Sequence, residues 1–359
     1  MLVKLYSAAL QSLNAIRVTI EVNTTRGMQF IIVGLPDSAV KESQQRIQAA
    51  IANSDYKYPM QNTLINMAPA DVRKEGTSYD LPIAVGLLAA TEIIRTPSLD
   101  RYMFIGELGL DGSVRPVAGA LSIAILARKL KMEGLIVPIS NVREVSVVNN
   151  LNVYGVENLR QVVDFLNGRL QIEPTVTDTR AEFAASQTMS DLDYADVKGQ
   201  NQVKRALEVA AAGGHNLIMI GPPGSGKTMM AQRLPTILPP LSLRESLEAT
   251  QVYSIASALP PGSTLISRRP FRSPHHTISQ TALCGGGVNP RPGEISLAHN
   301  GVLFCDELPE FARTTLEVLR QPLENRVITI NRAKYAVEYP CSFMFVASMN
   351  PCPCGYYND

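Results

Sequence analysis

The sequence predicts an α/β protein of two domains, the second of which is a doubly wound parallel sheet built around a phosphate-binding loop. Strands and helices alternate along the first part of the chain, and an apolar strand at 217–220 runs directly into a glycine-rich turn. Between these regions, residues 171–193 lose hydrophobic periodicity and gain serine, threonine, aspartate and proline, a composition typical of a linker. We therefore expect one α/β domain at 1–170 and a second at 194–359.

Within the first domain, each element is predicted from its hydrophobic period and its flanking turn residues. A hairpin is expected at 106–117, because Asp111 and Gly112 separate two apolar runs and Asp-Gly is a strong turn signal. The remaining elements follow from strand-like or helical periodicity. The predicted strands are 18–24, 30–33, 63–69 and 134–138, and the predicted helices are 38–54, 81–94, 119–131 and 158–167.

The turn after the strand at 217–220 has the spacing of a nucleotide phosphate-binding loop. Residues 217–228 read LIMIGPPGSGKT, and a helix is predicted at 229–234. In this pattern glycines let backbone N–H groups close around phosphate oxygens, Lys227 reaches the β- and γ-phosphates, and the Thr228 hydroxyl ligates Mg²⁺. The predicted nucleotide-binding residues are Gly221, Pro222, Pro223, Gly224, Ser225, Gly226, Lys227 and Thr228. The sequence therefore predicts a protein that binds ATP or GTP together with Mg²⁺.

Two further apolar runs end in polar side chains that suit hydrolysis. Asp306 and Glu307 follow one run, and Asn350 ends the next. In such sites the aspartate holds Mg²⁺ through its water shell, and the adjacent glutamate polarises the attacking water. Asn350 is expected to position that water or to contact the γ-phosphate, although an asparagine after a strand is also an ordinary turn residue. Glu307 and Asn350 are the predicted catalytic residues, and Thr228 and Asp306 are the predicted Mg²⁺ ligands.

The composition excludes several classes of protein. With 33 Lys and Arg against 32 Asp and Glu, the formal net charge is +1, so nucleic-acid binding has to come from a local patch. No apolar run approaches the ~20 residues of a membrane span, and the first residues lack the pattern of a signal peptide. All five cysteines lie in the second half of the chain, which favours a reducing, cytoplasmic location over a disulfide framework.

Four long segments of the second half carry whole motifs of a known family. They are VKGQNQVKRALEVAAAGGHNLIMIGPPGSGKT (197–228), FRSPHHTIS (271–279), NPRPGEISLAHNGVLFCDELPEF (289–311) and MNPCPCG (349–355). These segments resemble the magnesium-chelatase-like AAA+ ATPases of the ComM/YifB type. In the first domain, KEGTSYDLPIAVGLL (74–88) and GELGLDGSVRPVAG (106–119) resemble the Lon-protease-like domain of the S5 type that such proteins carry. The resemblance implies a hexameric ATP-driven ring, and a helicase that drives branch migration of recombination intermediates during natural transformation.

The Lon resemblance raises the alternative of an ATP-dependent protease. Ser78 matches the position of the Lon nucleophile, but Leu121 stands where the resemblance places the partner lysine. A serine hydroxyl without an adjacent base is a poor nucleophile, and Lys74 or Lys129 could replace that lysine only through a different geometry. We therefore expect a non-proteolytic domain that serves as a scaffold or contacts DNA.

A basic hairpin tip indicates which substrate the motor is expected to act on. The segment 327–339 has strand-like alternation on each side of a tip that contains Arg332 and Lys334, which predicts a hairpin. In related rings such a hairpin projects into the pore, where Arg332 and Lys334 would suit the phosphate backbone of single-stranded or branched DNA. Arg291 would lie on a second pore loop at 284–296. Two charges at a hairpin tip are also an ordinary solvated feature, and a chelatase-type motor that remodels a protein partner is the alternative.

Adjacent histidines and paired cysteines suggest metal sites. His275 and His276 follow each other on an extended segment and therefore point to opposite faces, which favours a structural or interface role over a shared metal. Cys352 and Cys354 provide two of the four ligands that structural zinc requires, so zinc is a hypothesis that needs further ligands. The resemblance places the lid, the arginine finger and the sensor arginine of a complete AAA+ module beyond Asp359.

Overall fold

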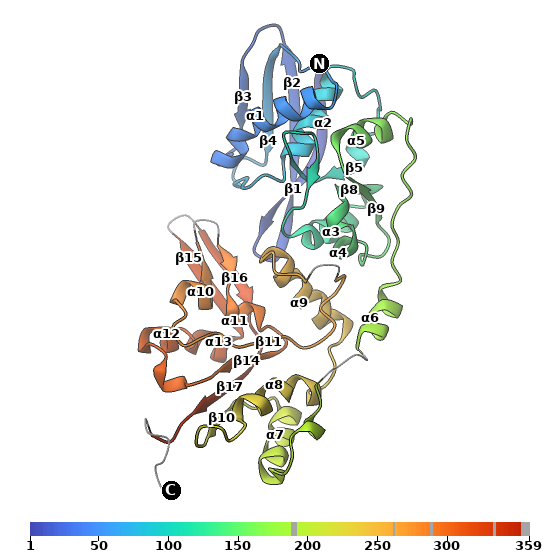
Figure 1. Cartoon of the computed structure of the whole chain (residues 1–359). Helices are drawn as coiled ribbons and strands as arrows, with labels where there is room; N and C mark the ends of the chain where they lie inside the picture. Colours follow the sequence, from blue (N-terminus) through green and yellow to red (C-terminus); the bar gives the residue numbers. More distant parts are fainter. Residues whose placement is uncertain (188–191, 261–262, 288–289, 333–334, 353–359) are drawn as a thin grey trace. The chain divides into compact units, whose positions relative to one another are not determined.

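The computed structural model contains two compact units, one formed by residues 1–179 with 260–264 and the other by residues 180–259 with 265–359 (Figure 1). The structure describes residues 1–187, 192–260, 263–287, 290–332 and 335–352. Within those ranges, no helix combines the length and the apolar character needed to cross a membrane. Each unit has its own sheet, and the two are described separately below.

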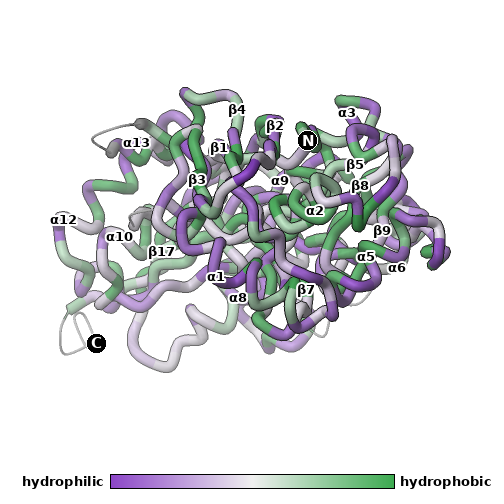
Figure 2. The backbone as a smooth tube through the Cα atoms, turned by 90° about the horizontal axis from the view of Figure 1, so that it is seen from above, coloured by the Kyte–Doolittle hydropathy of each residue, from purple (hydrophilic) through white to green (hydrophobic). Residues whose placement is uncertain are grey.

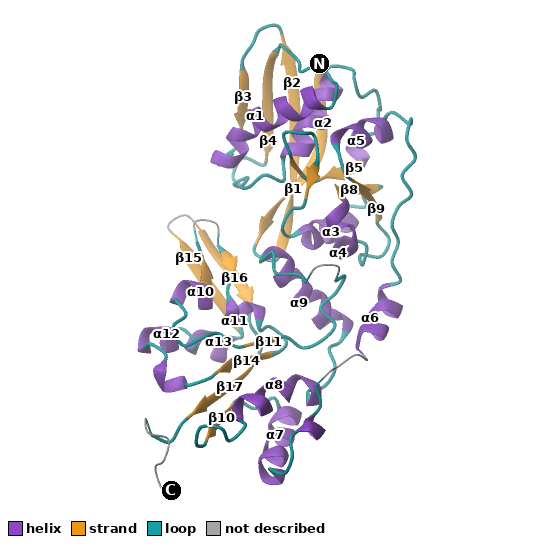
Figure 3. Cartoon of the chain, viewed as in Figure 1, coloured by secondary structure: helices purple, strands orange, loops and turns teal. Residues whose placement is uncertain are grey.

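The first unit is built on a seven-stranded mixed sheet in the order β3-β4-β2-β1-β5-β8-β9 (Figure 3). Its strands are β1 (Leu2–Gln11), β2 (Asn14–Thr25), β3 (Phe30–Val33), β4 (Asn62–Ala68), β5 (Tyr102–Phe104), β8 (Gly134–Pro138) and β9 (Asn152–Val156). Its helices are α1 (Ser38–Asn53), α2 (Asp80–Ala90), α3 (Ala120–Lys129), α4 (Val142–Val145) and α5 (Leu159–Leu166), with the short 3-10 helices η1 (Leu99–Arg101) and η2 (Ile139–Asn141). A small hairpin pairs β6 (Glu107–Leu108) with β7 (Val114–Arg115).

Helices pack on both faces of this sheet, although its long central strands are amphipathic. One face carries the buried Leu5, Ile20 and Val22, and the other carries Lys4, Arg17 and Glu21 over part of its length. A Cβ atom built at Gly86 of α2 would lie 2.6 Å from Val22 Cγ2 and 2.9 Å from Leu5 Cδ2, so α2 packs closely on one face. Gly119, at the start of α3, lies against Leu10. Since successive side chains of a strand point to opposite faces, Leu5 and Leu10 place α2 and α3 on opposite faces. The buried α2 is hydrophobic along most of its length, as Figure 2 shows by colour.

The predicted elements of the first domain are confirmed, with shifts at their ends. The predicted helix at 81–94 ends at Ala90, because the chain turns where Glu92 adopts a left-handed φ of 59°. Three strands, β1, β5 and β9, were not predicted. In β1 the buried Val3 and Leu5 alternate with exposed neighbours, so the same period-2 signal would have identified this strand.

The second unit is built on a four-stranded parallel sheet in the order β10-β17-β14-β11. Its strands are β10 (Leu217–Ile220), β11 (Phe271–Arg272), β14 (Val302–Cys305) and β17 (Met344–Met349). The helices of this half are α6 (Thr179–Gln187), α7 (Asn201–Gly213), α8 (Lys227–Ile237), α9 (Leu243–Ile255), α10 (Gln280–Cys284), α11 (Glu294–Leu297), α12 (Arg313–Glu317) and α13 (Arg320–Asn325), with the 3-10 helices η3 (Tyr194–Asp196) and η4 (Leu308–Glu310). Two hairpins pair β12 (Gly285–Gly286) with β13 (Arg291–Pro292) and β15 (Val327–Arg332) with β16 (Tyr335–Pro340).

The parallel sheet confirms the predicted α/β class of the second half. The hairpin predicted at 327–339 is confirmed by the antiparallel pairing of β15 with β16. Helix α6 lies inside the segment that was predicted to be a linker. Its alanines and glutamate are good helix formers, which explains a short helix in a segment without strong hydrophobic periodicity.

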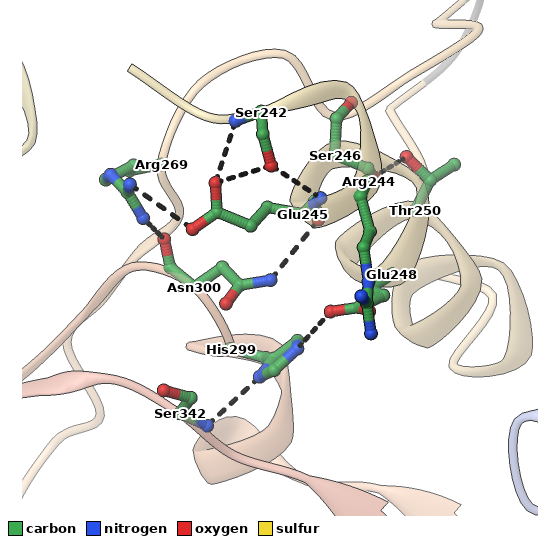
Figure 4. A network of polar contacts seen from close by, with 10 residues as sticks. All are labelled: Ser242, Arg244, Glu245, Ser246, Glu248, Thr250, Arg269, His299, Asn300 and Ser342. Carbon is green, nitrogen blue, oxygen red and sulfur yellow. Dashed lines mark hydrogen bonds and ion pairs between the residues drawn. The ribbon is translucent and has the colours of Figure 1, made fainter. Parts of the chain in front are cut away.

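A network of polar contacts joins the start of α9 to the turns that precede β14 and β17 (Figure 4). The Arg269 guanidinium lies 3.4 Å from the Glu245 carboxylate and donates to the carbonyl oxygen of Asn300 at 2.7 Å. The residue before Asn300, His299, accepts a hydrogen bond through Nδ1 from the backbone N–H of Ser342 at 3.0 Å. The network therefore fixes the loops at the amino end of β14 and β17, opposite the end where the site lies.

Candidate functional site

The phosphate-binding loop connects β10 to α8 at the carboxyl end of the parallel sheet. Gly224 and Gly226 have left-handed φ angles of 78° and 84°, and a Cβ atom built at either one would have no neighbour within 4 Å. Glycine is therefore needed here for the backbone conformation and not for lack of space. Gly226 is the N-cap of α8, so the unpaired N–H groups of the first helical turn face the loop.

The Lys227 ammonium lies inside the turn formed by the loop. Its Nζ donates to the carbonyl oxygens of Gly221 at 2.7 Å and Pro222 at 3.0 Å, and to Asn350 Oδ1 at 3.2 Å. The parallel pairing of β10 with β17 places Ile220 beside Met349, which brings Asn350 next to the loop. Two predicted site residues that are 123 positions apart in the chain are therefore in direct contact.

The Asp306 carboxylate connects the loop to the centre of the sheet. Thr228 Oγ1 donates to Asp306 Oδ2 at 2.7 Å, and the Ser348 hydroxyl donates to Asp306 Oδ1. Ser348 is fully buried on β17 and was not predicted as a site residue. A hydroxyl within an apolar run, two positions before Asn350, was the available signal.

The residues of this site fit a nucleoside triphosphate and Mg²⁺. The Thr228 hydroxyl and the Asp306 carboxylate are hard oxygen donors of the kind that Mg²⁺ prefers, and they are already adjacent. The hydroxyl oxygen of Ser225 in the loop is buried, and the described residues provide no hydrogen-bond partner for it. Buried polar atoms are normally hydrogen-bonded, and a phosphate oxygen would supply the partner.

The Glu307 carboxylate has a different partner from that of Asp306, although the two residues are adjacent. Glu307 has a left-handed φ of 53°, which is uncommon for a residue other than glycine. Its Oε2 lies 3.4 Å from Nδ1 of His276, in the segment that follows β11. The expectation that His275 and His276 point to opposite faces is wrong, because His276 begins a turn and the two rings lie 4.0 Å apart. The sequence gave no signal for the contact with Glu307, which depends on β11 lying next to β14.

Of the basic residues predicted to contact DNA, Arg291 and Arg332 lie on the two hairpins and not at the carboxyl edge of the parallel sheet. Arg291 is exposed on β13, and Arg332 ends β15, whereas Lys334 lies outside the described residues. The Tyr339 hydroxyl donates to the carbonyl oxygen of Pro290 at 2.9 Å, which joins the two hairpins. The roles of these basic residues stay predictions.

Zinc at the paired cysteines also stays a prediction. Cys352 is half-buried, and Cys354 lies outside the described residues. Among the residues that the structure does describe, no group of three or more histidine, cysteine, aspartate or glutamate side chains is placed to hold a metal ion.

Comparison with known proteins gives matches in both halves of the chain. Residues 193–359 match the family described as magnesium chelatase, subunit ChlI, and residues 20–141 match the family described as subunit ChlI of Mg-chelatase. The protein YifB of Escherichia coli (strain K12) is 47% identical over 354 residues, which cover 98% of this chain and 68% of YifB. Competence protein ComM of Haemophilus influenzae is 46% identical over 356 residues, which cover 98% of this chain and 69% of ComM. Lon protease 2 of Bacillus subtilis is 28% identical over 167 residues, which cover 43% of this chain and 29% of that protein.

Proposed function

Because the chain belongs to the magnesium-chelatase-like AAA+ ATPases of the YifB/ComM family, we propose that it hydrolyses ATP and uses the energy to remodel DNA as a branch-migration helicase. The observation that carries the ATPase part is the convergence of Lys227, Thr228, Asp306 and Asn350 at one edge of the sheet. The DNA part is supported by the similarity to a competence protein and by the basic hairpin tip. The proposed working form is a homo-hexameric ring.

Each site residue has a separate task in the proposed reaction. The loop N–H groups and the Lys227 ammonium bind the β- and γ-phosphates, and Ser225 adds a hydroxyl donor. Thr228 and Asp306 would hold Mg²⁺, which would neutralise the negative charge on the phosphoryl oxygens. Ser348 keeps the Asp306 carboxylate oriented toward Thr228.

Glu307 and Asn350 complete the proposed site. The Glu307 carboxylate accepts a hydrogen bond from the attacking water and polarises it toward the γ-phosphate. The Asn350 amide, which accepts from Lys227 through Oδ1, presents its N–H₂ group to the γ-phosphate or to the water. These roles place hydrolysis at the carboxyl ends of β10, β14 and β17.

The nucleotide site is tested with two variants that separate binding from turnover. Lys227→Ala should abolish tight ATP binding, because it removes the charge that pairs with the β- and γ-phosphates. Glu307→Gln should bind ATP but fail to hydrolyse it, because an amide is a much weaker base than a carboxylate. Titration with a fluorescent ATP analogue measures binding, and phosphate release measures turnover.

The control is Lys57→Ala, which removes an exposed lysine of the first unit and should change neither property. Equal nucleotide affinity of the wild-type chain and the Lys227→Ala variant would contradict the assignment of the site.

A further inference from the structure

We infer that His276 is a positioning residue for Glu307, an inference that rests on the proposed ATPase function and concerns a residue for which the sequence indicated another role. His276 Nδ1 lies 3.4 Å from Glu307 Oε2, and it comes from a different strand connection. A polarising carboxylate has to be held within hydrogen-bond reach of the water that it acts on. His276 holds the Glu307 carboxylate in one orientation before the water attacks.

Glu307 needs such a partner because, among the residues that the structure describes, no other side chain pairs with its carboxylate. The side chain is 56% exposed, so solvent surrounds more than half of it. A long flexible carboxylate loses appreciable rotamer freedom when it is fixed, and a free one spends most of its time in unproductive orientations. Glu307 has a left-handed backbone conformation and its carboxylate lies beside His276, whereas the Asp306 carboxylate contacts Thr228 and Ser348.

The His276 ring is itself held against the turn that carries Glu307. Its ring lies edge-on to Phe311, with centroids 6.4 Å apart and an interplanar angle of 75°, and Phe311 is 5% exposed. Glu307 and Phe311 flank the 3-10 helix η4, in which Glu310 N–H donates to the Glu307 carbonyl oxygen. His276 therefore contacts the residues at both ends of this turn, and the buried Phe311 provides the fixed surface.

The carboxylates of Asp306 and Glu307 are therefore held by residues from opposite sides of β14 in the sheet. Asp306 is bound by Thr228 after β10 and by Ser348 on β17. Glu307 is bound by His276 after β11, which lies on the other side of β14. Loss of His276 should therefore impair the step that needs Glu307 and leave the binding of nucleotide and Mg²⁺ intact.

Three substitutions of His276 test this inference through the rate of ATP hydrolysis. His276→Ala should lower kcat about tenfold while KM changes less than about twofold, because orientation is lost and binding is not. His276→Asn places an amide N–H₂ group close to the position of Nδ1 and should restore kcat to within about threefold of the wild type. His276→Gln extends its amide to the position of Nε2 and should not restore it.

A second measurement, by NMR, does not depend on ATP hydrolysis. The chain has four histidines, so the ring signal that is missing from the NMR spectrum of His276→Asn identifies His276. Glu307→Gln should shift this signal in the nucleotide-free protein, because it removes the carboxylate beside Nδ1. The control Glu310→Gln, which changes an exposed neighbour on the same turn, should leave the signal in place.

The outcomes separate this inference from the proposed function. If Lys227-dependent nucleotide binding and hydrolysis are observed but His276→Ala hydrolyses ATP like the wild type, the inference is wrong and the proposed function stands. Equal kcat values for His276→Asn and His276→Ala would also overturn it. If the chain binds no nucleotide, the proposed function fails, and an unshifted His276 signal in Glu307→Gln then overturns the contact as well.

Discussion

Ser78 matches the position of the Lon nucleophile, but the lysine that would activate its hydroxyl is replaced by Leu121. Leu121, which stands where the resemblance to Lon places a lysine, is fully buried on α3. Of the two alternative bases, Lys74 and Lys129, the first is also buried, and its ammonium donates to the carbonyl oxygen of Pro69. Burial lowers the pKa of Lys74, with a smaller opposing effect of Asp71. Its ammonium is engaged by a backbone carbonyl, so the expectation of a non-proteolytic domain is retained.

Ser78→Ala should therefore leave ATP hydrolysis within about twofold of the wild type, since a factor of two corresponds to ~0.4 kcal/mol and no activated nucleophile is removed. Phosphate release by the two proteins gives the comparison. Incubation with an unfolded protein substrate provides the stronger check. Cleavage by the wild type that disappears in Ser78→Ala would show that the first unit is a serine protease.

At the scale of elements, the second unit depends on polar contacts between loops at the amino end of its sheet. The buried His299 lies between the backbone N–H of Ser342 at 3.0 Å and the carboxylate of Glu248, 3.6 Å from Nε2 (Figure 4). Because Nδ1 accepts a hydrogen bond, the ring is neutral in this arrangement. Burial lowers the pKa of His299, and the carboxylates of Glu248 and Glu245 oppose this effect only in part.

This arrangement predicts a loss of stability in acid. The unfolded chain binds a proton at His299 near the ordinary histidine pKa of about 6.5, whereas the folded chain binds it at a lower pH. Between these two values the unfolded state holds more protons, so the free energy of unfolding rises with pH and falls as the pH drops below about 6.5. His299→Asn, which keeps an acceptor for Ser342, should reduce this decline.

Urea unfolding of the wild type and the variant at pH 5.5 and pH 7.5, followed by circular dichroism, measures the effect. His215→Asn removes an exposed histidine and serves as the control. An identical decline in the wild type and in His299→Asn would refute the contribution of His299.

At the scale of the whole molecule, the proposed function requires that the ATPase core act on DNA through surfaces outside the nucleotide site. The nucleotide residues lie at the carboxyl edge of the parallel sheet, and the basic tip belongs to a separate antiparallel hairpin. The chain covers 68–69% of its YifB and ComM relatives, so the activities of those whole proteins are proposals for this chain. The hairpin tip is the part of the proposal that a DNA-binding experiment can test directly.

Replacement of both Arg332 and Lys334 by alanine should weaken DNA binding alike for every sequence, because phosphate contacts carry no sequence information. The slope of log K against log salt should become shallower by about 0.9 for each phosphate that the variant no longer neutralises. ATP binding should stay unchanged, since Lys227 and Asp306 are untouched. Fluorescence anisotropy with single-stranded and branched DNA over a salt series measures both quantities.

The matched control replaces Arg313 and Arg320, two exposed arginines that pair with glutamates four positions later on α12 and α13. This variant removes the same charge away from the hairpin and should bind DNA like the wild type. Unchanged affinity and salt slope in the Arg332 and Lys334 variant would favour the alternative of a motor that remodels a protein partner.

Features that depend on neighbouring residues could be predicted without the fold. The phosphate-binding loop was predicted because its chemistry requires glycines, Lys227 and Thr228 at fixed spacing after a strand. The hairpin at 327–339 and most elements of the first unit were predicted because hydrophobic period and turn residues are local signals. Asp306 and Glu307 were recognised for the same reason, as polar residues that directly follow an apolar strand.

Which of these residues meet depends on the folded chain. The order β10-β17-β14-β11 places strands side by side that are far apart in the chain, and no local periodicity specifies that order. It brings Asn350 to Lys227 and Ser348 to Asp306. It also brings His276 to Glu307, because β11 pairs with β14. Strand pairing joins segments that are far apart in the sequence, so it is decided by the tertiary structure. The contacts of the site residues follow from that pairing.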